Sequence, residues 1–213
     1  MGGKSVKVVV IGAHPDDFEI GAGMRIMHHT RRNDEVIGIL CSDGEKGGER
    51  AIRLKEAEKS AEMLGLKKLY KLHLPDTRVL DLIILKDHIE KIIEKEKPSI
   101  VYTHFSEDTH QDHRTVSQAS SIACRKVPTI LMYKSPSTIS SKFNPHLFHV
   151  GTPEDFRKKE EAIKVFRSQM AKYNLLELRR IKIDACYYAA RLNLDGKFYA
   201  EPFCANHFII NLY

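Results

Sequence analysis

Residues 8–17 read VVVIGAHPDD, an apolar run followed at once by an imidazole and two carboxylates. A nearly continuous apolar run is typical of a strand that is covered on both faces of a parallel sheet. Such a strand delivers His14, Asp16 and Asp17 to its carboxyl end, which is where open α/β sheets bind their ligands. Three polar groups within four residues can ligate a metal and still leave one carboxylate free for chemistry. This stretch is therefore a candidate for half of an active site.

Strands alternate with helices over the first 134 residues. The hydrophobic periodicity predicts strands at 7–13, 35–41, 69–74, 99–105 and 129–134. Between them it predicts helices at 19–32, 49–64, 80–96 and 112–126. This alternation predicts an α/β fold with a Rossmann-like, doubly wound and mostly parallel sheet, of strand order 3-2-1-4-5 and with helices on both faces.

The last third of the chain follows a different pattern. Residues 135–151 are expected to be irregular, and Thr152 and Pro153 then provide the N-cap and the first turn of a helix. We expect that helix to run to about residue 173, a second helix to cover about 175–192, and residues 201–213 to supply an edge strand. The chain is thus predicted to be a single domain, 1–213, with a C-terminal extension of helices and an edge strand.

A second polar cluster, His110-Gln111-Asp112-His113, follows the fourth predicted strand. In the order 3-2-1-4-5 the first and fourth strands are neighbours at the point where the strand order reverses, so the two clusters should meet. His14 and Asp17 lie three residues apart and can meet on one turn, and one histidine of the second cluster would complete a three-ligand zinc site. Asp16 is then free to act as a general base, and the remaining histidine can stabilise charge on a carbonyl oxygen.

Helix capping is the alternative interpretation of both clusters. Asp16 or Asp17 has the residue type of an N-cap at a strand-to-helix turn, and the second cluster likewise precedes a predicted helix. Either cluster alone is compatible with capping. Their expected meeting at neighbouring strand ends favours a metal site over two unrelated caps.

Composition argues against several classes of protein. Hydrophobic residues make up 42% of the chain, and no apolar run approaches the roughly 18 residues of a membrane-spanning helix. The net charge is +6, but basic and acidic residues are interspersed along the predicted helices, which indicates solvated helix faces and no nucleic-acid partner. The four cysteines lack CxxC spacing and are expected to be buried free thiols. Together with an N-terminal stretch that lacks a signal-peptide pattern, they predict a cytoplasmic protein.

At the two clusters the chain resembles the PIG-L/LmbE family of zinc-dependent N-acetylglucosaminyl deacetylases. The family signatures are Ala-His-Pro-Asp-Asp near the N-terminus and His-x-Asp-His in mid-chain, which correspond to residues 13–17 and 110–113. The similarity is densest before residue 120 and continues at residues 43–48 (DGEKGG), Arg53 with Glu56, Leu64-Gly65, residues 74–76 (LPD), Ser168-Gln169, and Glu201 with Phe203.

The resemblance implies a metal centre and a base. His14, Asp17 and His113 would be the metal ligands. Asp16 would be the general base that takes a proton from water. The implied cofactor is Zn²⁺, or Fe²⁺ in the cell, because a set of two histidines and one aspartate discriminates weakly between these ions.

The resemblance also implies roles around the substrate. His110 would face the carbonyl oxygen, as a charged or hydrogen-bonding group, and Asp112 would orient a histidine. Glu45, Arg53 and Asp76 would contact the sugar. From the sequence alone, however, Arg53 is equally compatible with a surface helix position, and Asp76 with a residue that holds its turn.

Some positions depart from the family pattern. Gln111 replaces the proline that often separates the two motif histidines, a loop change that should leave the ligands in place. Some members carry a tyrosine two residues before the first motif histidine, where it assists catalysis; Asp108 stands there in this chain, so no tyrosine is assigned that role. The other histidines are expected to be structural, and His104, near a strand end, is the candidate for a supporting role beside the site.

The sequence thus predicts a zinc-dependent hydrolase that removes the N-acetyl group from an N-acetylglucosamine-type amino sugar or glycoconjugate and releases acetate. Two alternatives stay open, namely a metal-dependent hydrolase of another amide or ester bond and a non-catalytic sugar- or nucleotide-binding module. The lack of a GxGxxG phosphate loop after the first strand counts against the binding module. The aglycone and the oligomeric state, a homo-oligomer included, are left open by the sequence.

Overall fold

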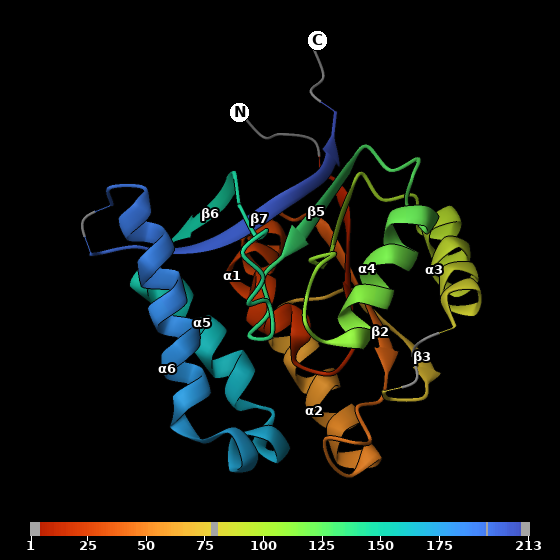
Figure 1. The fold of residues 1–213 in the computed structure, drawn as a ribbon, viewed down its shortest axis with the longest axis horizontal. Helices are drawn as coiled ribbons and strands as arrows, with labels where there is room; N and C mark the ends of the chain where they lie inside the picture. Colours follow the sequence, from red (N-terminus) through yellow and green to blue (C-terminus); the bar gives the residue numbers. More distant parts are fainter. Residues whose placement is uncertain (1–4, 78–80, 195, 210–213) are drawn as a thin grey trace.

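A seven-stranded sheet with helices on both faces forms the framework of the protein (Figure 1). The computed structural model describes residues 5–77, 81–194 and 196–209, and over residues 171–177 it describes the backbone alone. The strands are β1 Lys7–Gly12, β2 Glu35–Ser42, β3 Lys68–Leu74, β4 Ile100–His104, β5 Thr129–Tyr133, β6 Leu147–Gly151 and β7 Tyr199–Phe208. The helices are α1 Asp17–Arg31, α2 Arg50–Met63, α3 Leu82–Glu96, α4 Gln111–Ala123, α5 Pro153–Lys164 and α6 Arg167–Arg191. No helix within the described ranges combines the length and the apolar character needed to cross a membrane.

The strands are arranged in the order β3-β2-β1-β4-β5-β7-β6. The neighbours among β1 to β5 pair in parallel, while β7 runs antiparallel to both β5 and β6. This arrangement confirms the predicted α/β fold and the order 3-2-1-4-5 of a mostly parallel sheet. Val9 of β1 is in register with Ile37 of β2 and with Val101 of β4. The carboxyl ends of β1 and β4 are therefore neighbours.

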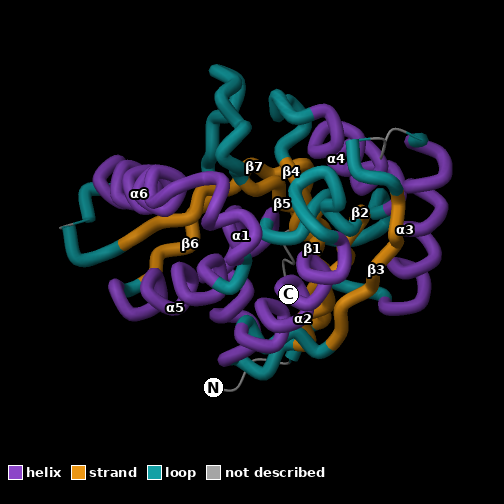
Figure 2. Tube along the Cα trace, turned by 90° about the horizontal axis from the view of Figure 1, so that it is seen from below, coloured by secondary structure: helices purple, strands orange, loops and turns teal. Residues whose placement is uncertain are grey.

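The apolar run of β1 contributes to both halves of the core, because alternate side chains of a strand point to opposite faces. Val8 and Val10 belong to a cluster with residues of α1, α5 and α6, whereas Val9 and Ile11 pack with residues of α3 and α4. Figure 2 shows α3 and α4 on one side of the strands and α1, α2 and α5 on the other. Every β1 residue after Lys7 is buried, which explains why the run is apolar without alternation.

The C-terminal helices break at a different place from the one predicted. The helix expected to reach residue 173 ends at Lys164, and α6 already begins at Arg167. Between them Phe166 is fully buried and packs against Leu40 of β2. Tertiary packing therefore ends the helix at a position that no glycine or proline marks in the sequence.

The C-terminal strand lies inside the sheet and not at its edge. β7 pairs with β5 on one side and with β6 on the other, so β6 is the edge strand. Residues 147–151, which were expected to be irregular, form this edge by pairing with the first half of β7. The predicted edge strand over 201–213 is thus corrected to an interior strand. Residues 210–213 and the predicted helix start at residue 80 lie outside the described residues.

The predicted helix cap at Thr152 and the predicted burial of three of the four cysteines are confirmed. Thr152 caps α5 as predicted, and its hydroxyl and backbone N–H exchange hydrogen bonds with Asp155 in a capping box. The buried free thiols are those of Cys41, Cys124 and Cys204. Cys186 is also a free thiol but is exposed, so the expectation of burial is wrong there.

A buried polar chain ties α1 to β4. Arg25 Nε donates to the hydroxyl of Tyr102 at 2.8 Å, and this hydroxyl lies 2.9 Å from His29 Nε2. His29 Nδ1 in turn lies 2.7 Å from Asp34 Oδ2. All four groups are satisfied when Tyr102 donates to a neutral His29 whose Nδ1–H donates to Asp34. Burial, assisted by the nearby positive charge of Arg25, lowers the pKa of His29 to about 4, so the ring is neutral at pH 7.

We expect the free energy of unfolding to fall as the pH drops from 6.5 toward 4. In this window His29 becomes protonated in the unfolded chain but stays neutral in the folded protein. The contribution of the neutral His29 to the free energy of unfolding is therefore fully present above pH 6.5 and is lost as the pH falls toward 4. The pKa shift corresponds to about 3 kcal/mol. Urea unfolding of the metal-free protein at a series of pH values measures this dependence.

The matched variants are His29→Gln and His88→Gln. Glutamine at position 29 can keep both hydrogen bonds without titrating, so the acid-side slope should flatten. His88 is exposed, and its replacement should leave the slope as in the wild type. Equal slopes in the wild type and His29→Gln would show that His29 does not cause the acid sensitivity.

Candidate active site

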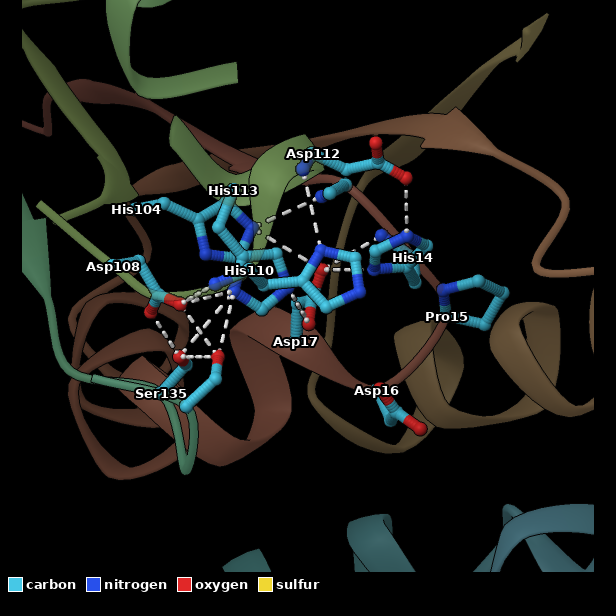
Figure 3. Close-up of polar contacts among 12 residues, drawn as sticks. His14, Pro15, Asp16, Asp17, His104, Asp108, His110, Asp112, His113 and Ser135 are labelled. Atoms are coloured by element: carbon cyan, nitrogen blue, oxygen red, sulfur yellow. Dashed lines mark hydrogen bonds and ion pairs between the residues drawn. The ribbon is translucent and has the colours of Figure 1, made fainter. Parts of the chain in front are cut away.

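The two polar clusters lie side by side at the carboxyl ends of β1 and β4 (Figure 3). The ring centroid of His14, in the loop after β1, lies 4.9 Å from that of His110 and 5.4 Å from that of His113. His110 is the N-cap residue of α4, and its Nδ1 accepts the backbone N–H of Asp112 at 3.2 Å. The juxtaposition expected from the strand order is thus present in the structure.

The carboxylate of Asp17 lies between the imidazoles of the two clusters. Its Oδ2 accepts the backbone N–H of His14 at 2.6 Å and lies 3.4 Å from His14 Nδ1. Its Oδ1 lies 3.2 Å from His113 Nε2. Asp17 is the first residue of α1, where the helix dipole favours a negative charge. Burial opposes ionisation, but the imidazoles of His113 and His104 outweigh it and hold the pKa of Asp17 well below its usual range.

Buried carboxylates hold the outward-facing nitrogens of His14 and His113. His14 Nε2 lies 3.1 Å from Oδ2 of the fully buried Asp112 and 3.2 Å from Oδ1 of Asp76. His113 Nδ1 lies 3.4 Å from Oδ1 of Asp108. Each ring therefore turns its other nitrogen toward the centre of the cluster. Carboxylates commonly hold the far nitrogen of metal-ligating histidines in this way, because they fix the orientation and tautomer of the ring.

Asp108 is itself held by the loop after β5. Its two oxygens accept hydrogen bonds of 2.5 to 2.6 Å from three hydroxyl groups, those of Ser135, Ser137 and Thr138. The backbone N–H of His110 donates a further hydrogen bond to Asp108 at 2.8 Å. Burial raises the pKa of Asp108, but His113 and the hydroxyl donors outweigh that effect and hold the pKa far below its usual range. The loop thus fixes the carboxylate that faces His113.

His104, at the end of β4, supports the second cluster by stacking. Its ring lies 3.9 Å from that of His113 with the two planes only 13° apart, and His113 also stacks on His110 at 4.5 Å. His104 is fully buried, and its Nε2 accepts the backbone N–H of Ala13 at 3.1 Å. Burial lowers the pKa of His104 to about 4. This position fits the supporting role that the sequence suggested.

Asp16 stands apart from the imidazoles, although it adjoins Asp17 in the chain (Figure 3). It occupies the N-cap position of α1 at φ 100°, in the left-handed region, and its side chain makes no capping hydrogen bond. Capping therefore does not explain Asp16. Its Oδ2 lies 3.4 Å from Nη1 of Arg53, whose Nη2 donates to the carbonyl of Pro15 at 2.9 Å. Burial raises the pKa of Asp16 to about 7, although Arg53 opposes the rise.

The three residues that the resemblance assigns to the sugar occupy different positions. Arg53, only 3% exposed, braces the loop that carries Asp16. Asp76 accepts the backbone N–H of Lys46 at 2.9 Å and also faces His14. Glu45 is exposed, and its carboxylate accepts the backbone N–H of Asp76 at 2.9 Å. Arg53 and Asp76 line the cavity described next, whereas Glu45 holds the turn that carries Asp76.

A cavity of about 490 Å³ opens onto the cluster, a volume that suits a small ligand. The members of the two motifs that line it are His14, Asp16, Asp17, His110 and His113. The C-terminal helices contribute Ile163, Gln169, Met170, Arg180 and Ile181, together with Phe166 between them. Polar atoms of the site are therefore open to a ligand that also contacts α5 and α6.

The donor set fits a divalent metal such as zinc. Oxygens of Asp17 lie 3.2 Å from His113 Nε2 and 3.4 Å from His14 Nδ1, and two ligands of a tetrahedral zinc ion stand roughly 3.4 Å apart. Among the described residues, three groups of ligand atoms lie within 4.8 Å of one another: His14–His110–His113, Asp17–His104–His113 and His14–Asp76–Asp112. Each group contains at most two of the predicted ligands. All three predicted ligands line the cavity, whereas His104 and Asp112 are fully buried.

Comparison with known proteins identifies the family of the chain. A family model described as PIG-L, GlcNAc-PI de-N-acetylase, matches residues 9–124, which is more than half of the chain. The chain belongs to the PIG-L family. YaiS of Escherichia coli (strain K12), described as an uncharacterized deacetylase, is 36% identical to this PIG-L protein over 168 residues, which cover 76% of this chain and 90% of that protein. The predicted family and the predicted class of enzyme, a deacetylase that hydrolyses an amide, are confirmed.

Two solved structures share the fold of this PIG-L protein. The N,N'-diacetylchitobiose deacetylase from Pyrococcus horikoshii is 25% identical with a TM-score of 0.78, over 95% of this chain and 84% of that chain. The 4-carboxy-2-hydroxymuconate hydratase GalB from Pseudomonas putida KT2440 is 16% identical with a TM-score of 0.83, over 98% of this chain and 99% of that chain. The second likeness concerns the fold alone. Because a deacetylase and a hydratase share the fold, the fold alone does not determine the reaction.

Some residues of this PIG-L site carry little or no signal in the sequence. Asp108 has a weak one, since it precedes His110 by two residues in the same polar segment. The position of Asp108 depends on contacts with the loop 135–138, for which the sequence pattern predicts only an irregular segment. The sequence also does not predict the cavity wall from α5 and α6, because its apolar residues have the pattern of ordinary core positions.

Replacement of Asp108 by alanine should lower the free energy of unfolding by about 3 kcal/mol, because three hydroxyls and His113 lose a buried charged partner. Glu107→Ala is the matched control, since Glu107 is exposed and pairs only at the surface with Lys142; its cost should be about 0.5 kcal/mol or less. Chemical denaturation of the two variants measures the difference. An equal decrease in the free energy of unfolding for the two variants would show that Asp108 does not support the site.

Proposed function

We propose that the protein is a zinc-dependent hydrolase that removes the N-acetyl group from an N-acetylglucosamine-type sugar or glycoconjugate and releases acetate. Membership of the PIG-L family supports the class of reaction. The likeness to a diacetylchitobiose deacetylase supports an N-acetylated amino sugar as the substrate. Fe²⁺ is the alternative metal, because two imidazoles and one carboxylate suit both ions.

One arrangement carries the proposal. The imidazoles of His14 and His113 face the carboxylate of Asp17 with their inner nitrogens, while Asp112 and Asp108 hold their outer nitrogens. We assign His14, Asp17 and His113 as the metal ligands on this ground. Three protein ligands leave a position for water or substrate, as a catalytic zinc site requires.

Asp16 is the general base of the proposed reaction. A bound zinc ion lowers the pKa of water toward ~7 and polarises an amide carbonyl. The carboxylate of Asp16 lies in the same cavity but outside the imidazole contacts, so it is free to take a proton from the attacking water. Arg53 beside it stabilises the ionised form that the first step needs. Asp16 then gives the proton to the departing sugar nitrogen, so that the products are a free amine and acetate.

His110 is the proposed hydrogen-bond donor to the carbonyl oxygen. Its Nδ1 accepts the backbone N–H of Asp112, so a neutral ring carries its proton on Nε2. Burial lowers the pKa of His110, which favours this neutral form. The Nε2–H can donate to the oxygen on which negative charge develops during attack. Asp112 acts separately by orienting His14 through its carboxylate.

The sugar itself is proposed to lie against Asp76 and Arg53. Both line the cavity beside the cluster, and a carboxylate and a guanidinium suit the hydroxyl groups of a sugar. Glu45 acts through Asp76, because its carboxylate holds the backbone of that residue. Asp76 and Arg53 are therefore the proposed sugar contacts, and Glu45 supports one of them.

The wild-type protein should release acetate from N-acetylglucosamine derivatives, and Asp16→Ala should lower kcat at least about a hundredfold, because the base is lost. The zinc content of Asp16→Ala should equal that of the wild type, since Asp16 is not a ligand. Asp87→Asn, at a surface carboxylate, serves as the control for the assay. An enzymatic acetate assay and elemental analysis supply the two measurements. Deacetylation by Asp16→Ala at the native rate would exclude Asp16 as the base.

Asp17→Ala and His113→Ala should each lose most of the bound metal, measured by elemental analysis after dialysis. The variant His104→Gln distinguishes the assigned ligand set from the alternative set Asp17–His104–His113. Glutamine keeps an acceptor for the Ala13 N–H but removes the imidazole. This variant should retain zinc. Full zinc occupancy in both ligand variants, or loss of zinc in His104→Gln alone, would overturn the ligand assignment.

A further inference from the structure

The cavity continues beyond the imidazole cluster to a wall built largely by the C-terminal helices. The apolar members of this wall come from α1, α5, the break at residue 166, and α6, namely Ile20, Ile163, Phe166, Met170 and Ile181. None of them has a part in the proposed hydrolysis. They line space that the non-reacting part of a substrate, its aglycone, can occupy.

Among the described side chains, every carboxylate that lines the cavity already has a partner. Asp16 pairs with Arg53 at 3.4 Å, and Asp17 lies between imidazoles of both clusters. Asp76 accepts a backbone N–H at 2.9 Å and faces His14. These carboxylates are therefore already engaged by groups other than the two cations described next.

Among the described side chains at the cavity, two cations have no such partner. Arg180 of α6 and Lys46 of the loop after β2 both line the cavity and are exposed. In the part of the chain that the structure describes, neither side chain makes an ion pair or a hydrogen bond. Asp184, one turn along α6 from Arg180, pairs with Lys134 instead. Glu45, next to Lys46, uses its carboxylate on a backbone N–H.

We infer that this part of the cavity binds an anionic group, a carboxylate or a phosphate, on the aglycone of the substrate, with Arg180 as its main contact. The inference rests on the proposed function, because the acetamido group must lie at the imidazole cluster. A guanidinium presents a planar fork that makes two parallel hydrogen bonds to either anion. Lys46 adds a second positive charge to the lining of the cavity.

The test compares substrates that share the sugar and differ in charge: N-acetylglucosamine 1-phosphate, a carboxymethyl N-acetylglucosaminide and the neutral methyl N-acetylglucosaminide. The wild type should have a lower KM for at least one anionic substrate, and the lower of the two identifies the anion. In Arg180→Gln the ratio of the neutral KM to the anionic KM should fall about tenfold, with the corresponding kcat ratio unchanged. Arg179→Gln removes the same charge from the adjacent exposed position, which does not line the cavity, and should keep the wild-type ratio.

Calorimetric binding of the deacetylated products, glucosamine 1-phosphate and methyl glucosaminide, separates this inference from the proposed function. A binding preference for the anion that depends on Arg180 supports the inference even if no acetate is released from any substrate, an outcome that would overturn only the proposed function. The inference is overturned if the wild type shows no preference for either anion in KM or in binding. It is also overturned if Arg179→Gln and Arg180→Gln reduce the preference equally.

Discussion

The carboxylate of Asp17 faces an imidazole from each polar cluster, and the organisation of the site follows from that contact. Burial lowers the pKa of His113, but the carboxylates of Asp17 and Asp108 outweigh it and raise the pKa to about 9. The cluster therefore stabilises positive charge between its carboxylates, as a proton on imidazole or as a metal ion. Asp112 and Asp108 matter because they turn both rings so that the free nitrogens converge on this one carboxylate.

Such a concentration of buried acids requires compensation from the surrounding fold. An unpaired carboxylate in the protein interior costs several kcal/mol, so each one needs donors. Three hydroxyls and a backbone N–H supply them for Asp108, and the backbone N–H of Thr77 donates to Asp112 at 2.9 Å. These donors come from loops after three different strands. The sheet brings those loops together because the parallel strands β3, β4 and β5 end at the same edge.

The sequence was sufficient to predict the parallel part of the sheet, β1 to β5, and the meeting of the two motifs. Both depend on patterns that one segment carries by itself: the apolar run of β1, and polar residues at the ends of β1 and β4. The break at Phe166, the interior position of β7 and the hydroxyl donors around Asp108 depend on packing between distant segments. Such contacts leave no local period or spacing, so local patterns could not predict them.

The location of these features separates chemistry from substrate selection. The PIG-L model matches residues 9–124, which include His14, Asp16, Asp17, His110 and His113. The cavity wall formed by α5 and α6, with Arg180, lies entirely outside that match. In the proposed function, the residues that hold a metal and move a proton must keep their geometry for any N-acetylated substrate, whereas the wall needs to fit only one aglycone. On that proposal the chemistry sits on the strand ends, inside the range that the family model matches. The C-terminal helices, whose boundaries the sequence predicted least well, are then where substrate preference is free to diverge.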